Sequence, residues 1–470
     1  MRKLLFTMFV LAAAGGAGAQ EFSDLAVNAS SIKPLSLSAG IPMPFAAAIT
    51  PKGSDTRWYG ADSRQARMQF TAYVLYEIPP RLGNSVSQIL SNPGQRQKIT
   101  EIVNLQLQHM YGAFTMHPGF VDNPGIPSGD YNVTLLKAEK LPDGLYAKVS
   151  YSYDDVTVFS SKLFRGSAGR RIQFVLPKDP VTIYSKGFPR PSSKTNLCTD
   201  EHYNGEGDFW YFWNPYQEGC PISGDDLVEV KTDLKPLPVT RNTYPEYEKL
   251  YGGSGDELRI TYIVGVDEGF QSGDLGKQTF NDAFTGLKNA GFDVTVDKAR
   301  RKELSLSLGE KTAAVEMLLM DPNSAEFAHE AVRGMQDSDI FLYDGHSGLG
   351  GYLNPERLAE DTGQKLKLPK NKYQIFVFQG CSTYAYYNTA FFNLKRSSSD
   401  PKGTKNLDII TNGIGADFAV GADVDVAFLT SITNGERPSW QEIINNIRAA
   451  EGDSSALSHI NGDEDNPKTP

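Results

Sequence analysis

The chain has 470 residues, more than one hydrophobic core usually supports, so we expect two or three domains. Its hydrophobic content of 40% and aromatic content of 11% are typical of a globular protein and exclude wholesale disorder. The 46 Lys and Arg residues against 56 Asp and Glu residues give a net charge of −10, which argues against nucleic acid or anionic membranes as general partners.

The first residues predict where the protein is found. Arg2 and Lys3 precede an apolar run from Leu4 to Ala14, and small residues ending in Ala17-Gly18-Ala19 follow. This pattern is typical of a secretory signal peptide over residues 1–19, cut near Ala19. The apolar run is too short to span a bilayer, and we find no later stretch that is long enough. We therefore expect a secreted or periplasmic protein without a transmembrane anchor.

The chain after the signal predicts an extended lead-in over residues 20–50 and a β-rich domain over residues 51–245. Ala, Ser and Pro dominate the lead-in, whereas the following region alternates apolar and polar residues between Pro, Gly and Asp turn signals. Asn92-Pro93-Gly94 opens a helix with apolar residues on one face. The strands that we expect lie at 68–76, 131–138, 145–153, 156–163 and 171–176.

Two of the three cysteines are expected to pair. Cys198 and Cys220 lie 22 residues apart in a loop-rich, aromatic stretch and are natural disulfide partners in an oxidising compartment, which leaves Cys381 as the free thiol. The aromatic run 209–213 between them is interpreted as core around the disulfide rather than a carbohydrate or protein contact surface. Asp and Glu residues near His202 match no ligand spacing, so we expect no metal site.

The second half of the chain alternates strands and helices, which predicts an α/β domain with a mostly parallel sheet over residues 246–450. A linker at 236–251 precedes it. Residues 451–470 are acidic and polar and are expected to form a frayed tail. The expected strands are 258–266, 292–296, 339–343, 373–378 and 407–411, with further strand structure in 303–320, and the expected helices are 274–290, 324–335, 383–394 and 440–449.

Two of these strands end in residues capable of catalysis. The strand at 339–343 leads into a loop with His346, and the strand at 373–378 leads into a loop with Cys381, 35 residues further on. Functional sites of open α/β sheets lie at the carboxyl ends of strands, so the two side chains are expected to meet. A thiol beside an imidazole can become a thiolate, the nucleophilic form of cysteine. The alternative is that Cys381 is a buried apolar residue.

The backbone around these residues is rich in small residues. Gly380 leaves room beside the nucleophile, and Gly348 lets the histidine loop turn tightly. We expect the N–H groups of Cys381 and of Ser347 or Gly348 to bind a developing oxyanion.

These motifs resemble those of the caspase-like (clan CD) cysteine peptidases, which include caspases, metacaspases, legumains, clostripain and the gingipains. In that family one hydrophobic strand leads into His-Gly and a second leads into Gln-Ala-Cys or Gln-Gly-Cys. Here Ile340–His346 and Ile375–Cys381 carry the match. It implies a three-layer α/β/α sandwich and endopeptidase activity, with Cys381 as nucleophile and His346 managing the proton. One departure is Ser347, where the family pattern has glycine directly after the histidine.

The resemblance also implies a pocket for the substrate side chain before the cleaved bond and a maturation cut. Asp417 is a candidate for holding a basic side chain, although a solvated loop carboxylate is the simpler interpretation. Asp344 is a candidate for orienting the histidine loop or for capping a turn. Arg396, in an expected exposed loop, is a candidate processing site.

The hypothesis is thus an exported cysteine endopeptidase that needs no cofactor and acts on a protein or peptide substrate. Calcium dependence and oligomeric state stay open. One alternative is a catalytically inactive caspase-like protein that acts as a surface binding module. Another keeps the reactive thiol but assigns it to a different amide or acyl transfer.

Overall fold

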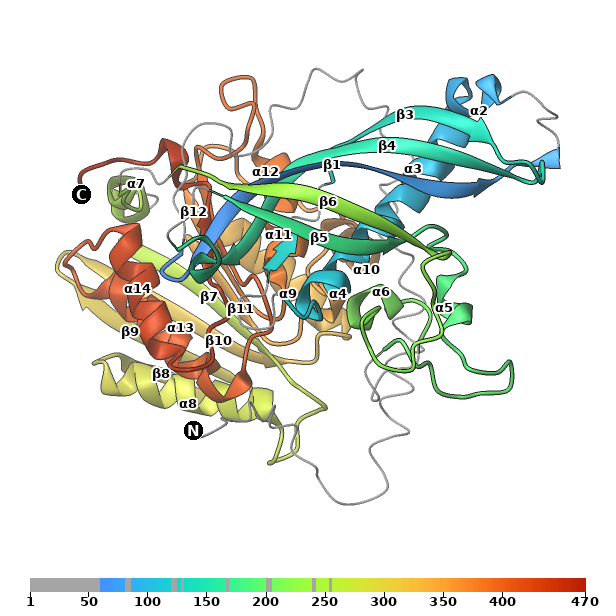
Figure 1. Ribbon diagram of the computed structural model, residues 1–470. Helices are drawn as coiled ribbons and strands as arrows, with labels where there is room; N and C mark the ends of the chain where they lie inside the picture. Colours follow the sequence, from blue (N-terminus) through green and yellow to red (C-terminus); the bar gives the residue numbers. More distant parts are fainter. Residues whose placement is uncertain are drawn as a thin grey trace.

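A computed structural model of the chain describes residues 60–80, 86–119, 125–127, 131–165, 169–199, 205–238, 242–252 and 256–470. An antiparallel sheet organises the first half, and a mixed, largely parallel sheet with helices organises the second (Figure 1). The protein is therefore an α/β protein, as expected. The predicted signal peptide and lead-in lie outside the described residues.

Over the described residues of the first half, six strands form the antiparallel sheet. Their order is β2-β4-β1-β6-β5, with β3 also paired to β4. β1 and β4 pair along all 15 residues of each strand and form the centre of the sheet. Side chains of α3, α4 and α6 share a core with the sheet. The elements are β1 (Ser63–Glu77), α2 (Ser87–Ser91), α3 (Pro93–Gln108), α4 (Met110–Thr115), β2 (Gly125–Pro127), β3 (Val133–Lys140), β4 (Tyr146–Ser160), β5 (Arg170–Pro177), α5 (Ile183–Lys186), α6 (Phe209–Phe212) and β6 (Leu227–Pro236).

One sequence prediction in this half is wrong. The strands expected at 145–153 and 156–163 are a single strand, β4, which runs through Asp154 and Asp155 without a turn. Arg67 on β1 donates to both carboxylate oxygens of Asp154 at 2.6 Å, and Asp155 accepts the backbone N–H of Asn132 at 3.1 Å. These hydrogen bonds satisfy the carboxylates of Asp154 and Asp155 within the sheet, so the strand continues past them.

The predicted disulfide is confirmed, since Cys198 and Cys220 are bonded. Phe209 and Trp213 are buried in the same core as Cys198, which confirms that most of the aromatic run is core. Trp210 points elsewhere and packs with Tyr384 of the second half. The aromatic run therefore contributes both to the core of the first half and to the contact between the two halves.

In the part of the second half that the structure describes, eight strands form a sheet in the order β14-β13-β12-β11-β7-β10-β9-β8. Strands β10, β7, β11, β12 and β13 are mutually parallel, and the other three are antiparallel to their neighbours. The bounds of the elements are α7 (Tyr247–Gly252), β7 (Glu257–Gly265), α8 (Leu275–Asn289), β8 (Asp293–Lys298), β9 (Arg301–Leu308), β10 (Lys311–Met320), α9 (Ala325–Asp337), β11 (Ile340–Asp344), α10 (Pro355–Thr362), β12 (Gln374–Gln379), α11 (Thr383–Tyr387), α12 (Ala390–Lys395), β13 (Leu407–Thr411), α13 (Phe418–Thr433), α14 (Trp440–Ala450) and β14 (His459–Asn461).

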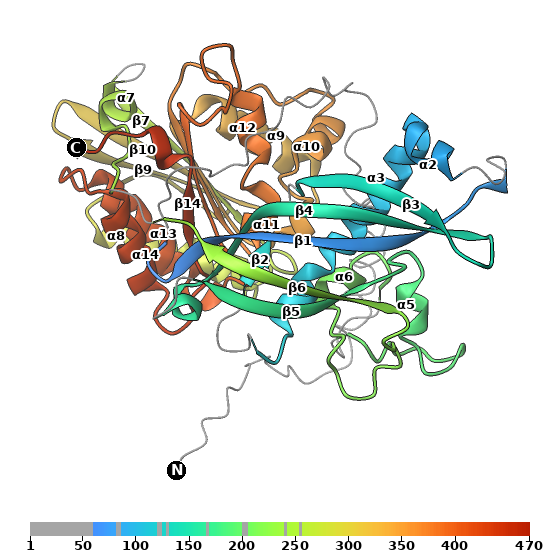
Figure 2. The same ribbon diagram turned by 45° about the horizontal axis from the view of Figure 1, so that its top comes forward.

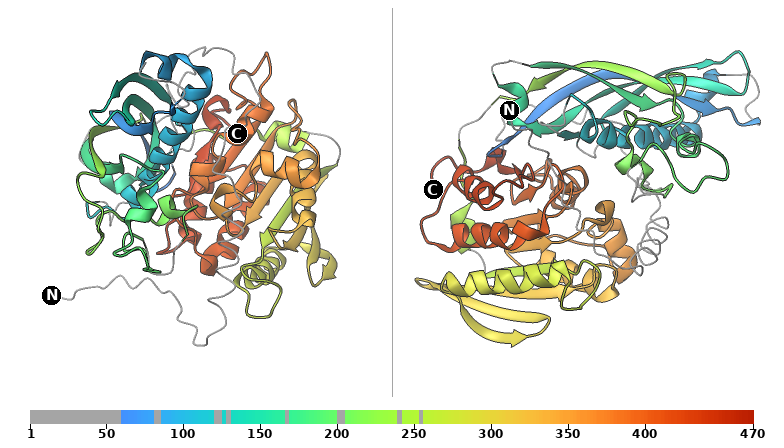
Figure 3. Two further views of the ribbon diagram at one scale, coloured as in Figure 1. Left: turned by 90° about the vertical axis from the view of Figure 1, so that its right-hand side faces the viewer. Right: turned by 60° about the horizontal axis from the view of Figure 1, so that its bottom comes forward.

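Helices cover both faces of this sheet. α8, α13 and α14 pack on one face, and α9, α10 and α12 pack on the other (Figure 2). The antiparallel sheet of the first half lies beside the β14–β13 end of the second sheet (Figure 3). Hydrogen bonds cross between the halves, among them one from Ser63 Oγ to the carbonyl oxygen of Ser458 at 3.0 Å.

Several elements differ from the sequence predictions. α13 was not predicted, because it is apolar on nearly all sides and lacks the one-sided pattern of a surface helix. The helix expected over 383–394 is broken into α11 and α12. The frayed tail is wrong: β14 pairs with β13, and His459 and Ile460 are buried. The polar composition of this segment gave no sign of β14, the strand at the edge of the sheet.

A buried acid pair joins the parallel sheet to α13. Asp344 ends β11 and Asp425 lies on α13, and the hydroxyl of Tyr262 donates to Asp425 at 2.5 Å. A Cβ at Gly421 would lie 2.6 Å from Asp344, so glycine permits this close approach. Burial raises the pKa of Asp344 to about 7, and burial together with the charge of Asp344 raises the pKa of Asp425 well above its usual value.

We expect this pair to make folding stability depend on pH. A carboxyl group whose pKa is raised on folding stabilises the folded state fully below the unfolded pKa, near 3.8, and loses that contribution as pH rises through the folded pKa, near 7 for Asp344. Asp425→Asn removes one acid and keeps the shape. We expect about 2 kcal/mol of added stability at pH 8 and little change at pH 4, measured by urea unfolding. Asp282→Asn, at an exposed position on α8, is the control. Equal pH dependence in wild type and Asp425→Asn would contradict the assignment.

Candidate active site

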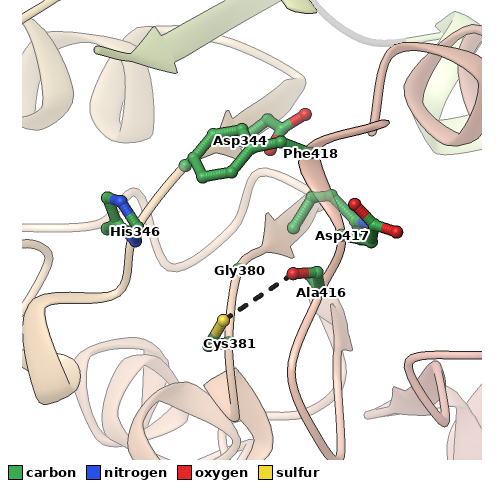
Figure 4. A pocket seen from close by; sticks show the side chains of 9 residues that line it. Asp344, His346, Gly380, Cys381, Ala416, Asp417 and Phe418 are labelled. Atoms are coloured by element: carbon green, nitrogen blue, oxygen red, sulfur yellow. Dashed lines mark hydrogen bonds between the residues drawn. The ribbon is translucent and has the colours of Figure 1, made fainter. Parts of the chain in front are cut away.

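Adjacent parallel strands bring His346 and Cys381 to one edge of the sheet. β11 and β12 pair in register, with Asp344 opposite Gln379 at their carboxyl ends. Each candidate residue lies two positions beyond its strand end, and both line one small pocket (Figure 4). The pocket is lined by Asp344, Gly345, His346, Gln379, Gly380, Cys381, Ala416, Asp417 and Phe418.

Glycines let the two loops touch. The backbone N–H of Gly345 donates to the carbonyl oxygen of Gln379 at 3.0 Å, and Gly345 has a φ of +150°, which glycine adopts without strain. A Cβ at Gly380 would lie 2.6 Å from the carbonyl oxygen of Gly345. The histidine and cysteine loops are therefore fixed to one another by backbone contacts.

The turn of the histidine loop falls one residue after Ser347. Ser347 has ordinary helical dihedral angles, whereas Gly348 and Leu349 have φ values of +55° and +51°. The nitrogen of Ser347 lies 3.7 Å from the position that a Cβ of Gly380 would take, so this N–H is at the cysteine loop. Ser347 thus presents a backbone N–H beside the candidate nucleophile.

The surroundings of Cys381 favour the protonated form of its thiol. Its Sγ donates to the carbonyl oxygen of Ala416 at 3.8 Å (Figure 4). Burial raises the pKa of the Cys381 thiol, and the nearby charges of Asp344 and Asp417 raise it further. The ready-made thiolate that we expected from the sequence is therefore disfavoured here, and the thiol proton must be removed before attack.

A carboxylate that the sequence analysis missed holds His346. The ring Nε2 of His346 is 2.6 Å from Oδ1 of Asp267, and the edge of the ring packs against Phe418 with centroids 5.1 Å apart. Asp267 lies two residues beyond β7, the strand on the other side of β11. Asp267 follows a strand end, just as His346 and Cys381 do, and this was the one signal in the sequence that could have identified it. The sequence did not show, however, that β7 pairs with β11. Among the described residues, no hydrogen bond joins His346 to Cys381.

The remaining candidates occupy different surroundings. Asp344 ends β11, where its carboxyl group contacts that of Asp425 and interacts electrostatically with His346. Asp417 is exposed and begins α13, where it accepts the N–H of Ala419 at 2.9 Å, and its carboxylate points away from Cys381 (Figure 4). Arg396 is exposed directly after α12. Its role as a processing site and the role of Asp417 in specificity stay predictions.

The described residues contain no group of three or more His, Cys, Asp or Glu side chains arranged to hold a metal ion. They also contain no helix that is long and apolar enough to cross a membrane.

Comparisons with known proteins add no assignment to this geometry. No protein-family model matches the chain, and no match was found among curated proteins. The site must therefore be interpreted from its own residues.

Proposed function

We propose that the chain is an exported cysteine endopeptidase that hydrolyses peptide bonds with Cys381 and His346. One observation carries the proposal: both side chains line the same pocket, each two residues beyond the end of adjacent parallel strands. Backbone N–H groups at Ser347 and Cys381 would bind the oxyanion there.

The arrangement of the sheet supports a caspase-like sandwich as the finer fold. In chain order the parallel strands are β7, β10, β11, β12 and β13, and β10 and β11 flank β7. This is a doubly wound order whose direction changes between β7 and β11, and ligands of such sheets bind beyond the carboxyl strand ends. Asp267, His346 and Cys381 follow β7, β11 and β12 respectively, so they gather at that edge.

In the proposed reaction, the thiol of Cys381 transfers its proton through His346 to the leaving amine. Its sulfur forms a bond to the peptide carbonyl carbon, the C–N bond breaks, and a thioester remains. A water molecule then attacks the thioester and gives a proton to His346, which passes it to the sulfur as the C–S bond breaks and the acid product leaves. Nε2 of His346 contacts Asp267, so Nδ1 would carry the proton transfers in this reaction.

The protonated state of Cys381 favours a second candidate, the inactive caspase-like binding module. A thiol that donates to the carbonyl oxygen of Ala416, and whose pKa is raised by burial and by the charges of Asp344 and Asp417, is a poor nucleophile. The two functions differ in whether Cys381 performs turnover.

Replacement of either candidate catalytic residue decides between them. We expect Cys381→Ala to abolish hydrolysis of fluorogenic peptides that end in Arg, Lys, Asn or Asp, because the nucleophile is gone. His346→Ala should lower kcat by about 100-fold or more, because proton transfer is lost. A wild-type protein that binds such peptides without cleaving them would favour the binding module.

Asp267→Asn tests how the histidine is held. The amide keeps the shape but removes the carboxylate that orients the imidazole, so we expect kcat to fall about 10- to 100-fold with KM changed less than about twofold. Glu268→Gln changes the exposed neighbouring carboxylate and should behave as wild type. Equal kinetics of Asp267→Asn and wild type would remove Asp267 from the site.

The acidic surroundings of the thiol predict a pH profile for its labelling by iodoacetamide. We expect the labelling rate of Cys381 to rise only at alkaline pH, because its pKa is raised by burial and by Asp344 and Asp417. Asp417→Asn still caps α13 and should shift this rise to lower pH. Asp423→Asn, at an exposed position of the same helix, is the control. An unshifted profile in Asp417→Asn would show that this carboxylate does not act on the thiol.

A further inference from the structure

The residue after the candidate nucleophile has a strained backbone. Ser382 is fully buried and has φ +57° and ψ +26°, a left-handed conformation that residues with a Cβ rarely adopt. Its N–H donates to the carbonyl oxygen of Ile414 at 3.0 Å, and its own carbonyl oxygen accepts the N–H of Ala385 at 2.9 Å. Such conformations persist only where the surroundings enforce them, and they are concentrated at functional sites.

The side chain that holds Ser382 comes from the first half of the chain. The hydroxyls of Ser382 and of Tyr111 on α4 form a buried hydrogen bond of 2.6 Å across 271 residues of sequence. The Tyr111 ring stacks on Tyr211 with centroids 4.2 Å apart and an angle of 16°. A Cβ at Gly112 would lie 2.2 Å from the carbonyl oxygen of Trp213, so α4 fits closely against the aromatic run. Tyr111 is therefore itself held in place.

The turn that contains Ser382 also touches the histidine loop. α11 starts directly after Ser382, and its Tyr387 donates to the carbonyl oxygen of Ser347 at 3.2 Å. Tyr386 packs against Gly350, where an added Cβ would lie 2.7 Å from the ring. A change in the backbone of Ser382 would thus alter both the direction of Cys381 and the contact between the two loops.

We propose that Tyr111 is a positioning residue that the first half of the chain supplies to the active site, holding the Ser382 turn so that Cys381 faces the substrate. This inference rests on the proposed function. It makes the antiparallel half part of the catalytic unit, so that removing this half disorders the nucleophile turn instead of uncovering an active site. Tyr111 does not touch the reacting atoms and acts through Ser382.

The test uses the full mature protein with Tyr111→Phe, which deletes only the hydroxyl. We expect kcat for peptide hydrolysis to fall about 10- to 100-fold while KM changes less than about twofold, because the nucleophile is misplaced and substrate contacts remain. Tyr151→Phe is the matched control, because the Tyr151 hydroxyl also has a buried hydrogen bond, to Gln106 in the core of the first half. It should leave kcat unchanged.

Ser382→Ala removes the same hydrogen bond from its other end. Ser382→Ala also ends the contact of Ser382 with the Tyr211 hydroxyl, so we expect a loss of kcat at least as large. We expect no further loss when Tyr111→Phe is added, because Ser382→Ala has already deleted the Tyr111 hydrogen bond. Additive losses, or a kcat of Tyr111→Phe equal to or above that of wild type, would overturn the proposal. A rise in kcat would identify the contact as a block on the site.

Hydrogen–deuterium exchange gives a readout that does not depend on activity. We expect peptides covering residues 380–387 to exchange faster in Tyr111→Phe than in wild type or Tyr151→Phe, because the amides of this turn lose their support. Unchanged exchange there would overturn the inference even if peptides are cleaved. If the wild-type protein cleaves no peptide, the proposed function fails, and exchange alone still decides whether Tyr111 holds the turn.

Discussion

The parallel pairing of β11 with β12 is the constraint on which the site depends. Because the strands are in register, Asp344 and Gln379 end side by side, and the Gly345 N–H can reach the carbonyl oxygen of Gln379. A slip of one residue would reverse the faces of every side chain on the strand and separate the loops. The fully buried apolar side chains of both strands resist such a slip. Packing of the core thereby sets the distance between an imidazole and a thiol.

The electrostatics of the site oppose spontaneous ionisation of the thiol. A low-pKa cysteine usually lies beside positive charge or a helix N-terminus, whereas Cys381 lies near carboxylates and in partial burial. In the proposed reaction, the Cys381 thiol would therefore stay protonated until a substrate is bound, and His346 would then take up its proton. In an oxidising compartment, a protonated thiol is also less prone to oxidation than a thiolate.

The features that depend on neighbouring residues in the sequence were predicted correctly. The short apolar strands that lead into His346 and Cys381, the helix that opens at Asn92, and the Cys198–Cys220 disulfide were all expected from the local sequence and are present. Asp267 and Tyr111 were missed because each acts on a residue 79 or 271 positions away. α13 and β14 were missed because tertiary burial, not local periodicity, determines them. The sequence therefore predicted the candidate residues of the site but not the distant residues that contact them.

The position of β14 has a consequence for how the sheet is completed. β14 follows every other strand of the sheet in chain order, yet it occupies the edge next to β13. Until residues 459–461 have been made, β13 presents an unpaired row of backbone N–H and C=O groups. Open strand edges recruit strands from other chains, so a partly synthesised or shortened chain carries an aggregation-prone surface beside β12 and β13. Three residues in a polar segment therefore protect the nascent protein.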